Sequence, residues 1–135
     1  MQYITTPHEA ELNAAEVMKS WDYLDAVATT GGADGGIDVS SKRALAQFKW
    51  KGAAASRPEM QQLFGSRGTD TSKELFFFAA SRYTKDAVTY ADQVGMRLFV
   101  YDPVGAMTPA NSHAQAFVKA SQATSKPVSP VLSSC

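Results

Sequence analysis

The chain has 135 residues, of which 44% are apolar and 19% charged, so it can bury one core and is not a disordered polymer. Thirteen Lys and Arg balance thirteen Asp and Glu, which excludes a polybasic binder and requires that any polyanion be held by a local patch. The single cysteine, Cys135, excludes a disulfide framework and a thiolate zinc site. The sequence shows no signal-peptide pattern and no apolar run of membrane-spanning length. We therefore expect a cytoplasmic protein that does not associate with membranes.

Two capping boxes mark the helices of the first half of the chain. Thr6 and Glu9 enclose a proline at the first helical position and predict a helix that ends near residue 20 or 21. Ser56 and Glu59 predict a second helix, which we expect to stop at Gly65. Between them, short apolar runs bounded by turn residues predict three strands, at residues 25–30, 37–41 and 44–50.

The second half of the chain alternates strands with helices. The run 75–81 is apolar almost throughout, as in a strand that is covered on both faces, and residues 97–102 form another such run. Between them, Thr84 and Gly95 delimit a third helix. The order α-β-β-β-α-β-α-β predicts an α/β fold, in which a mixed central sheet is flanked by helices.

The pattern weakens after this last strand. We assign residues 1–105 to one domain and residues 106–135 to a C-terminal extension. Within the extension, residues 113–120 are expected to form a short helix, and the Ser/Pro-rich segment after them is expected to be mobile.

Three polar residues of the predicted β-hairpin are candidates for a metal-binding catalytic site. If the hairpin turns at Lys42 and Arg43, Asp38 pairs with Gln47, and Lys49 lies two residues along on the same face. A carboxylate and an amide oxygen are hard ligands suited to Mg²⁺ or Mn²⁺, and a nearby ammonium can orient water or stabilise developing charge. A solvated Asp–Lys pair on a strand is the simpler alternative. The metal-site interpretation requires that the three side chains share one face and that the ammonium is not buried in an unrelated pair.

The same stretch resembles a known nuclease family. The segment from Gly32 to Val39, followed by Gln47-Phe48-Lys49, is similar to the Mrr-type branch of the PD-(D/E)XK (restriction endonuclease-like) superfamily, in which the second acid of the signature is typically Gln. The resemblance continues over the following helix, strand, helix and strand, to about residue 102. Phe48 departs from the branch, which commonly has Cys at that position.

The resemblance implies roles for individual residues. Asp38 would be the principal metal ligand, Gln47 the second ligand and Lys49 the catalytic lysine. The family often adds an acid from the first helix, and counting back from the end of that helix gives Glu11. Glu11 also lies on the apolar stripe of the helix, where an acid needs a partner or a metal. The alternative for Glu11 is an acid that interacts with the helix dipole.

The distribution of charge favours DNA as the partner. Residues 1–38 hold seven acids and one base, whereas residues 39–58 hold five bases and no acid. We expect this basic stretch, together with a lysine that follows the 75–81 strand, to bind the phosphates that flank the hydrolysed phosphodiester bond. The predicted nucleic-acid-binding residues are Lys42, Arg43, Lys51, Arg57 and Lys85.

The sequence thus predicts a metal-dependent endonuclease that hydrolyses DNA phosphodiester bonds. Cutting both strands would require a homodimer or two binding events, and a separate recognition subunit would supply target choice. The alternative is a non-catalytic nucleic-acid-binding or assembly subunit that keeps the nuclease fold. A nucleotide-binding role for the glycines at 31–36 is less favoured, because a strand follows them where a phosphate loop would precede a helix.

Overall fold

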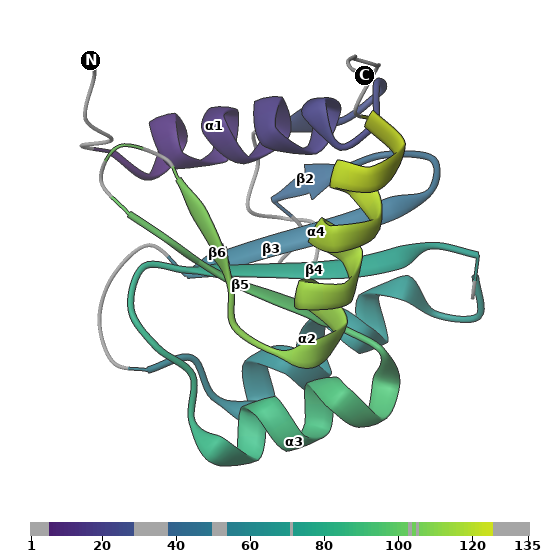
Figure 1. The fold of residues 1–135 in the computed structure, drawn as a ribbon. Coiled ribbons are helices and arrows are strands. Elements are labelled where there is room, and N and C mark those ends of the chain that lie inside the picture. The colour runs from purple at the N-terminus through teal and green to yellow at the C-terminus, as the bar shows by residue number, and fades with distance from the viewer. Residues whose placement is uncertain are drawn as a thin grey trace.

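A computed structural model describes residues 6–28, 38–49, 54–70, 72–102, 104 and 106–125. These residues form one six-stranded sheet and four helices (Figure 1). In chain order the elements are α1 (Pro7–Ser20), β1 (Val27–Ala28), β2 (Val39–Ser40), β3 (Ala44–Lys49), α2 (Arg57–Arg67), β4 (Glu74–Ala79), α3 (Lys85–Val94), β5 (Arg97–Tyr101), β6 (Met107–Pro109) and α4 (Ser112–Ser125).

The sheet is mixed, as the sequence predicts. Its strands lie in chain order from β1 to β6. The first three strands are antiparallel neighbours, β3, β4 and β5 are parallel, and β6 returns antiparallel to β5. The two parallel steps pass through α2 and α3, because parallel neighbours need a crossover connection. The α/β fold class and its element order are confirmed.

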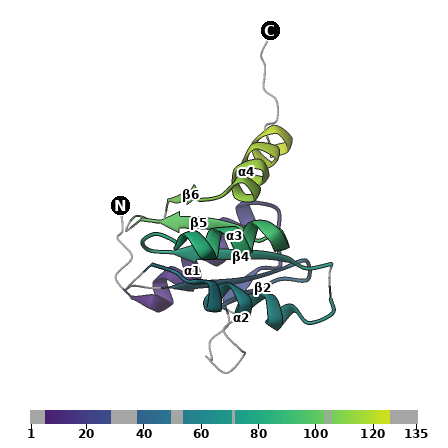
Figure 2. The same cartoon turned by 90° about the horizontal axis from the view of Figure 1, so that it is seen from below.

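Helices cover both faces of the sheet and bury two cores. α1 and α4 pack on the face that includes Phe76 and Phe78, whereas α2 and α3 pack on the face that includes Leu75 and Phe77. Successive side chains of a strand point to opposite faces, so the run of apolar residues in β4 fills both cores. Figure 2 views the molecule from the side of α2 and α3, with α4 lying beyond the β6 edge. Within the described residues, no helix has the length and apolarity needed to span a bilayer.

Both predicted capping boxes are present. In each, the Glu at the third helical position accepts from the backbone N–H of the capping residue. In α1 the capping hydroxyl also accepts from the N–H of that Glu, whereas in α2 it donates to the Glu carboxylate. The predicted end of α2 is wrong, since the helix passes through Gly65 and ends after Arg67. Gly68 takes the terminal role with φ of 62° and donates to the carbonyl of Gly65. A single glycine inside a helix costs only about 1 kcal/mol, so Gly65 does not stop it.

Residues 106–125, predicted to belong to a C-terminal extension, complete the sheet and one core. β6 pairs with β5, and Ala114 of α4 is fully buried in the α1/α4 core. The strand was not predicted from the sequence, because it is short and contains Pro109, a residue that sheets tolerate at an edge. α4 is also longer than the predicted helix. The predicted mobile tail lies mostly outside the described residues.

Asn111 joins this C-terminal part to the rest of the core. It is 5% exposed, and its side-chain oxygen accepts from the backbone N–H groups of Leu98 and Ala114. Its amide nitrogen donates to the carboxylate of Asp92 and to the carbonyl of Met96. The side chain of Asn111 therefore caps α4 and also pairs with the backbone N–H of Leu98 near the start of β5.

We expect Asn111→Ala to lower the free energy of unfolding by about 2–4 kcal/mol, because it removes a cap and leaves buried backbone groups unpaired. Chemical denaturation followed by circular dichroism measures this change. Ser112→Ala, at the exposed neighbouring position, is the control and should change the free energy by less than about 0.5 kcal/mol. An unchanged midpoint for Asn111→Ala would show that the C-terminal part contributes little to the fold.

Candidate active site

The side chains of β3 divide between the two faces of the sheet. Ala44 and Ala46 belong to the core under α1 and α4, and Leu45 belongs to the core under α2 and α3. Strand alternation then directs Gln47 and Lys49 to the α2 face. The ion pair between Lys49 and Glu59 of α2 agrees with this face for Lys49.

The backbone at Asp38 differs in detail from the prediction. The predicted hairpin register is confirmed for Val39, which pairs with Ala46, and for Ser40, which pairs with Leu45. The N–H of Asp38 donates to the carbonyl of Ala46 at 2.8 Å, so the ladder ends before the predicted pair with Gln47. Two residues of one strand then face one residue of the other, as in a β-bulge. Asp38 lies beside β3, one position from the predicted partner, and bulges of this kind re-aim side chains next to active sites.

The side chain of Gln47 has a buried polar atom that lacks a hydrogen-bond partner among the described residues. Its side-chain oxygen Oε1 is buried and accepts no hydrogen bond within the described residues. Buried polar atoms in folded proteins are nearly always satisfied, so such an atom calls for a ligand, an ion or a bound water. An amide carbonyl oxygen is also a suitable ligand for Mg²⁺. The donor chemistry at this end of β3 therefore fits a hard cation.

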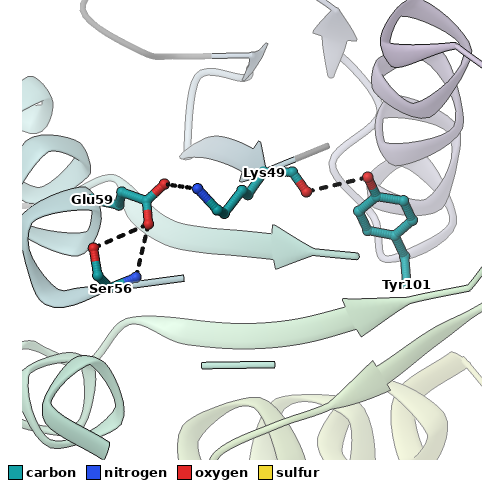
Figure 3. Close-up of polar contacts among 4 residues, drawn as sticks. All are labelled: Lys49, Ser56, Glu59 and Tyr101. Atoms are coloured by element: carbon teal, nitrogen blue, oxygen red, sulfur yellow. Dashed lines mark hydrogen bonds and ion pairs between the residues drawn. The ribbon is translucent and has the colours of Figure 1, made fainter. Parts of the chain in front are cut away.

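Lys49 is held by an acid of α2. Its ammonium Nζ lies 2.9 Å from Oε2 of Glu59, and the two side chains are each 27% exposed (Figure 3). The other carboxylate oxygen of Glu59 accepts from the backbone N–H of Ser56 at 2.8 Å and from its hydroxyl at 3.2 Å. With about a quarter of each side chain in solvent, the pair lies at the surface, and the ammonium is not enclosed in the core.

The charge state of Glu59 follows from these contacts. Partial burial acts to raise its pKa, but the hydrogen bonds and charge of Lys49 and the hydrogen bonds from Ser56 outweigh it. The net effect holds the pKa of Glu59 below its ordinary value. The carboxylate is therefore ionised at neutral pH and binds Lys49 as a charged partner.

The sequence predicts Glu59 as part of a helix cap and gives no sign of its contact with Lys49. The two residues belong to two separate patterns. The capping box places Glu59 in the first turn of α2, and the alternation of β3 points Lys49 at the helix that follows. Only the three-dimensional packing of α2 on β3 brings the two patterns together.

The backbone of Lys49 is also anchored. Its carbonyl accepts from the N–H of Ala80 at 3.2 Å and from the hydroxyl of Tyr101 at 3.3 Å (Figure 3). Burial raises the pKa of Tyr101 to about 12, so this hydroxyl keeps its proton and donates at neutral pH. Contacts from β4 and β5 thus fix the end of β3.

Glu11, the predicted third ligand, lies on a different element from the other candidate residues. It lies on α1, which covers the opposite face of the sheet, and its side chain is 20% exposed, with Oε1 3.7 Å from Nδ1 of His8. In Figure 1, α1 begins on the side of the molecule at which β3 and β4 end. α1 thus covers the face of the sheet opposite to the α2 face to which Lys49 points, and the role of Glu11 as a ligand stays a prediction.

The predicted DNA-contacting residues occupy two places. Arg57 and Lys85 are the first residues of α2 and α3, the helices that follow β3 and β4, so they lie at the edge of the sheet where Lys49 lies. Arg57 is 3.3 Å from Asp86 and lies over the ring of Tyr90. Helix N-termini are suited to phosphate, because their N–H groups are unpaired and their dipole favours an anion.

Lys42 and Arg43 lie elsewhere. They form the turn before β3, at the opposite end of that strand from Lys49, about 20 Å away at the usual rise per residue. Arg43 donates to the carbonyl of Asp22 at 2.8 Å, and its guanidinium lies over the ring of Tyr23. The expectation that the whole basic stretch adjoins the site is therefore wrong for these two residues. Lys51, the remaining predicted contact, lies outside the described residues.

The site differs from an all-acid metal centre. No group of three or more His, Cys, Asp or Glu side chains able to hold a metal ion occurs within the described part of the chain. A centre built from Asp38 and Gln47 would rely on an amide for one of its ligands, as the sequence predicts. It has fewer negative charges than a centre with a second carboxylate, and we expect weaker cation binding for that reason.

One comparison with known proteins gives a match, and it identifies the family of the chain. The model of a family described as a restriction endonuclease, the Mrr catalytic domain, matches residues 4–107. No curated protein and no solved structure matches the chain. The match begins just before α1, includes β2 and β3 with the three candidate residues, and continues to β6. The mixed sheet with helices on both faces is the restriction endonuclease-like fold, and the chain belongs to the Mrr-type family of restriction endonucleases.

Proposed function

We propose that this protein is a metal-dependent endonuclease that hydrolyses phosphodiester bonds of DNA. The observation that supports the proposal most directly is the buried Oε1 of Gln47, which accepts no hydrogen bond within the described residues. Gln47 follows Ala46 on β3, and the carbonyl of Ala46 accepts from the backbone N–H of Asp38. Asp38 and Gln47 would hold Mg²⁺ or Mn²⁺. Because α1 covers the opposite face of the sheet, Glu11 would be a third ligand only if its side chain passes the end of β3. A bound divalent cation would supply Lewis acidity and a water of lowered pKa.

The protein residues would act on the substrate as follows. Asp38, the residue just before β2, would contribute a negatively charged ligand to the cation site. Lys49 has a positive charge on the same face of β3 as Gln47, so it can orient the attacking water or neutralise the charge that develops on the phosphate. Arg57 and Lys85 would bind the flanking phosphates from the N-terminal ends of α2 and α3.

A cleavage assay on the purified protein tests the proposal. Supercoiled plasmid DNA should be converted to the nicked form in Mg²⁺ or Mn²⁺, and excess EDTA should abolish the conversion. Nicking should precede linearisation, since one site cuts one strand, unless two chains act together. Isothermal titration with Mn²⁺ alone provides a readout that does not depend on cleavage.

The outcomes separate this function from the alternative. DNA binding without cleavage in either metal, together with no heat of Mn²⁺ binding, would support a non-catalytic nucleic-acid-binding or assembly subunit. The observation that favours this alternative is that no group of three or more His, Cys, Asp or Glu side chains able to hold a metal ion occurs within the described residues. Cleavage that is insensitive to EDTA would overturn the metal dependence.

A further inference from the structure

The carboxylate of Glu59 is held on both of its oxygens. Oε1 accepts two hydrogen bonds from Ser56, which precedes α2, and Oε2 accepts from the ammonium of Lys49 (Figure 3). We propose that Glu59 is the positioning residue for Lys49: anchored by Ser56, it holds the lysine ammonium at the end of β3, where the lysine acts on DNA. The inference rests on the proposed nuclease function and adds a residue to it.

A capping role alone does not account for the contact. A capping box needs one oxygen of the Glu to accept from the backbone of the cap, and Oε1 does this. The second oxygen is directed to β3, an element ten residues earlier in the chain, at a distance of 2.9 Å. The same side chain thus joins the start of α2 to the residue that the family resemblance makes catalytic.

The geometry leaves Lys49 able to act. An ammonium has three donor hydrogens, and the bond to Glu59 uses one of them. The side chain is 27% exposed, so water or a phosphate oxygen can approach the others. Lys49 has a long, flexible stem, and an anchored carboxylate restricts the positions of its charge. The cause of the restriction is the pairing of Glu59 with Ser56, whose backbone is fixed by the helix start.

The test uses Glu59→Gln in the full chain. Gln is accepted at this position of a capping box, so α2 keeps its cap while the charged contact with Lys49 is lost. We expect kcat for plasmid nicking to fall about 10- to 100-fold, with KM changed by less than about twofold, as for a group that acts in the chemical step. The matched control is Glu16→Gln, which removes a surface ion pair with Lys19 on α1 and should leave kcat unchanged.

A second variant tests whether Glu59 acts through Lys49. In a Lys49→Met background, adding Glu59→Gln should cause no further loss of the residual nicking activity, because the positioned group is already absent. If Glu59→Gln has full activity, or if it causes the same fractional loss with and without Lys49, the proposal is overturned.

A measurement without metal or DNA distinguishes this inference from the proposed function. Acetylation of lysines by a limiting amount of acetic anhydride, followed by peptide mass spectrometry, reports the reactivity of each ammonium group. Glu59→Gln should raise the rate at Lys49 several-fold and leave Lys19 unchanged, whereas Glu16→Gln should do the reverse. Should the wild-type protein fail to cut DNA while Lys49 still responds, the nuclease function fails and the contact is structural. An unchanged rate at Lys49 overturns the positioning role whatever the cleavage assay shows.

Discussion

Asp38→Asn should reduce metal-dependent nicking of DNA by about 1,000-fold, equivalent to about 4 kcal/mol in the barrier. Asn has nearly the shape of Asp, and the backbone bond from residue 38 to Ala46 does not depend on the side chain. The substitution therefore keeps the hairpin and removes the negative charge that would hold the cation. Heat from Mn²⁺ binding should disappear together with the activity.

The control for this prediction is Asp70→Asn. Asp70 is an exposed acid in the loop after α2, where it accepts from the hydroxyl of Ser72, and Asn can make the same contact. Its rate and its heat of Mn²⁺ binding should match those of the wild-type protein. If Asp38→Asn retains wild-type nicking, Asp38 is not a ligand and the site must be sought elsewhere in the chain.

Local patterns predicted local structure well. Each capping box involves residues three apart and is complete within one turn, so Thr6 with Glu9 and Ser56 with Glu59 could be read directly from the sequence. The hairpin register was equally accessible, since the turn at Lys42 and Arg43 sets the pairing of Val39 with Ala46. The bulge at Asp38 could not be predicted, because alternation alone gives no sign of an extra residue.

Contacts between distant elements were not accessible in the same way. Lys42 and Lys49 lie close together in the sequence, yet the extended chain of β3 separates them by the length of a strand. Conversely, Glu59 was identified from its helix and Lys49 from its strand, and only the packing of α2 on β3 brings them together. β6 was missed because its stability comes from pairing with β5 rather than from its own short sequence.

Lys49→Met should lower kcat for nicking by about 100-fold or more while DNA binding changes by less than about threefold. Met keeps most of the length and apolar surface of the lysine stem but has no charge to orient water or stabilise the transition state. Lys49→Arg keeps the charge in a different shape and should recover part of the rate, since guanidinium and ammonium are not equivalent at a positioned site. Single-turnover cleavage of a labelled duplex separates the chemical step from binding.

Stability must be measured beside activity, because Lys49→Met leaves the carboxylate of Glu59 without its ionic partner. The pair is partly exposed, so we expect a loss of about 1 kcal/mol in the free energy of unfolding, which the double variant Lys49→Met/Glu59→Gln should largely restore. The double variant should remain as inactive as Lys49→Met. Recovery of stability without recovery of cleavage would assign the lost rate to the missing ammonium; recovery of both would show that Lys49 serves the fold and that the catalytic group is another residue.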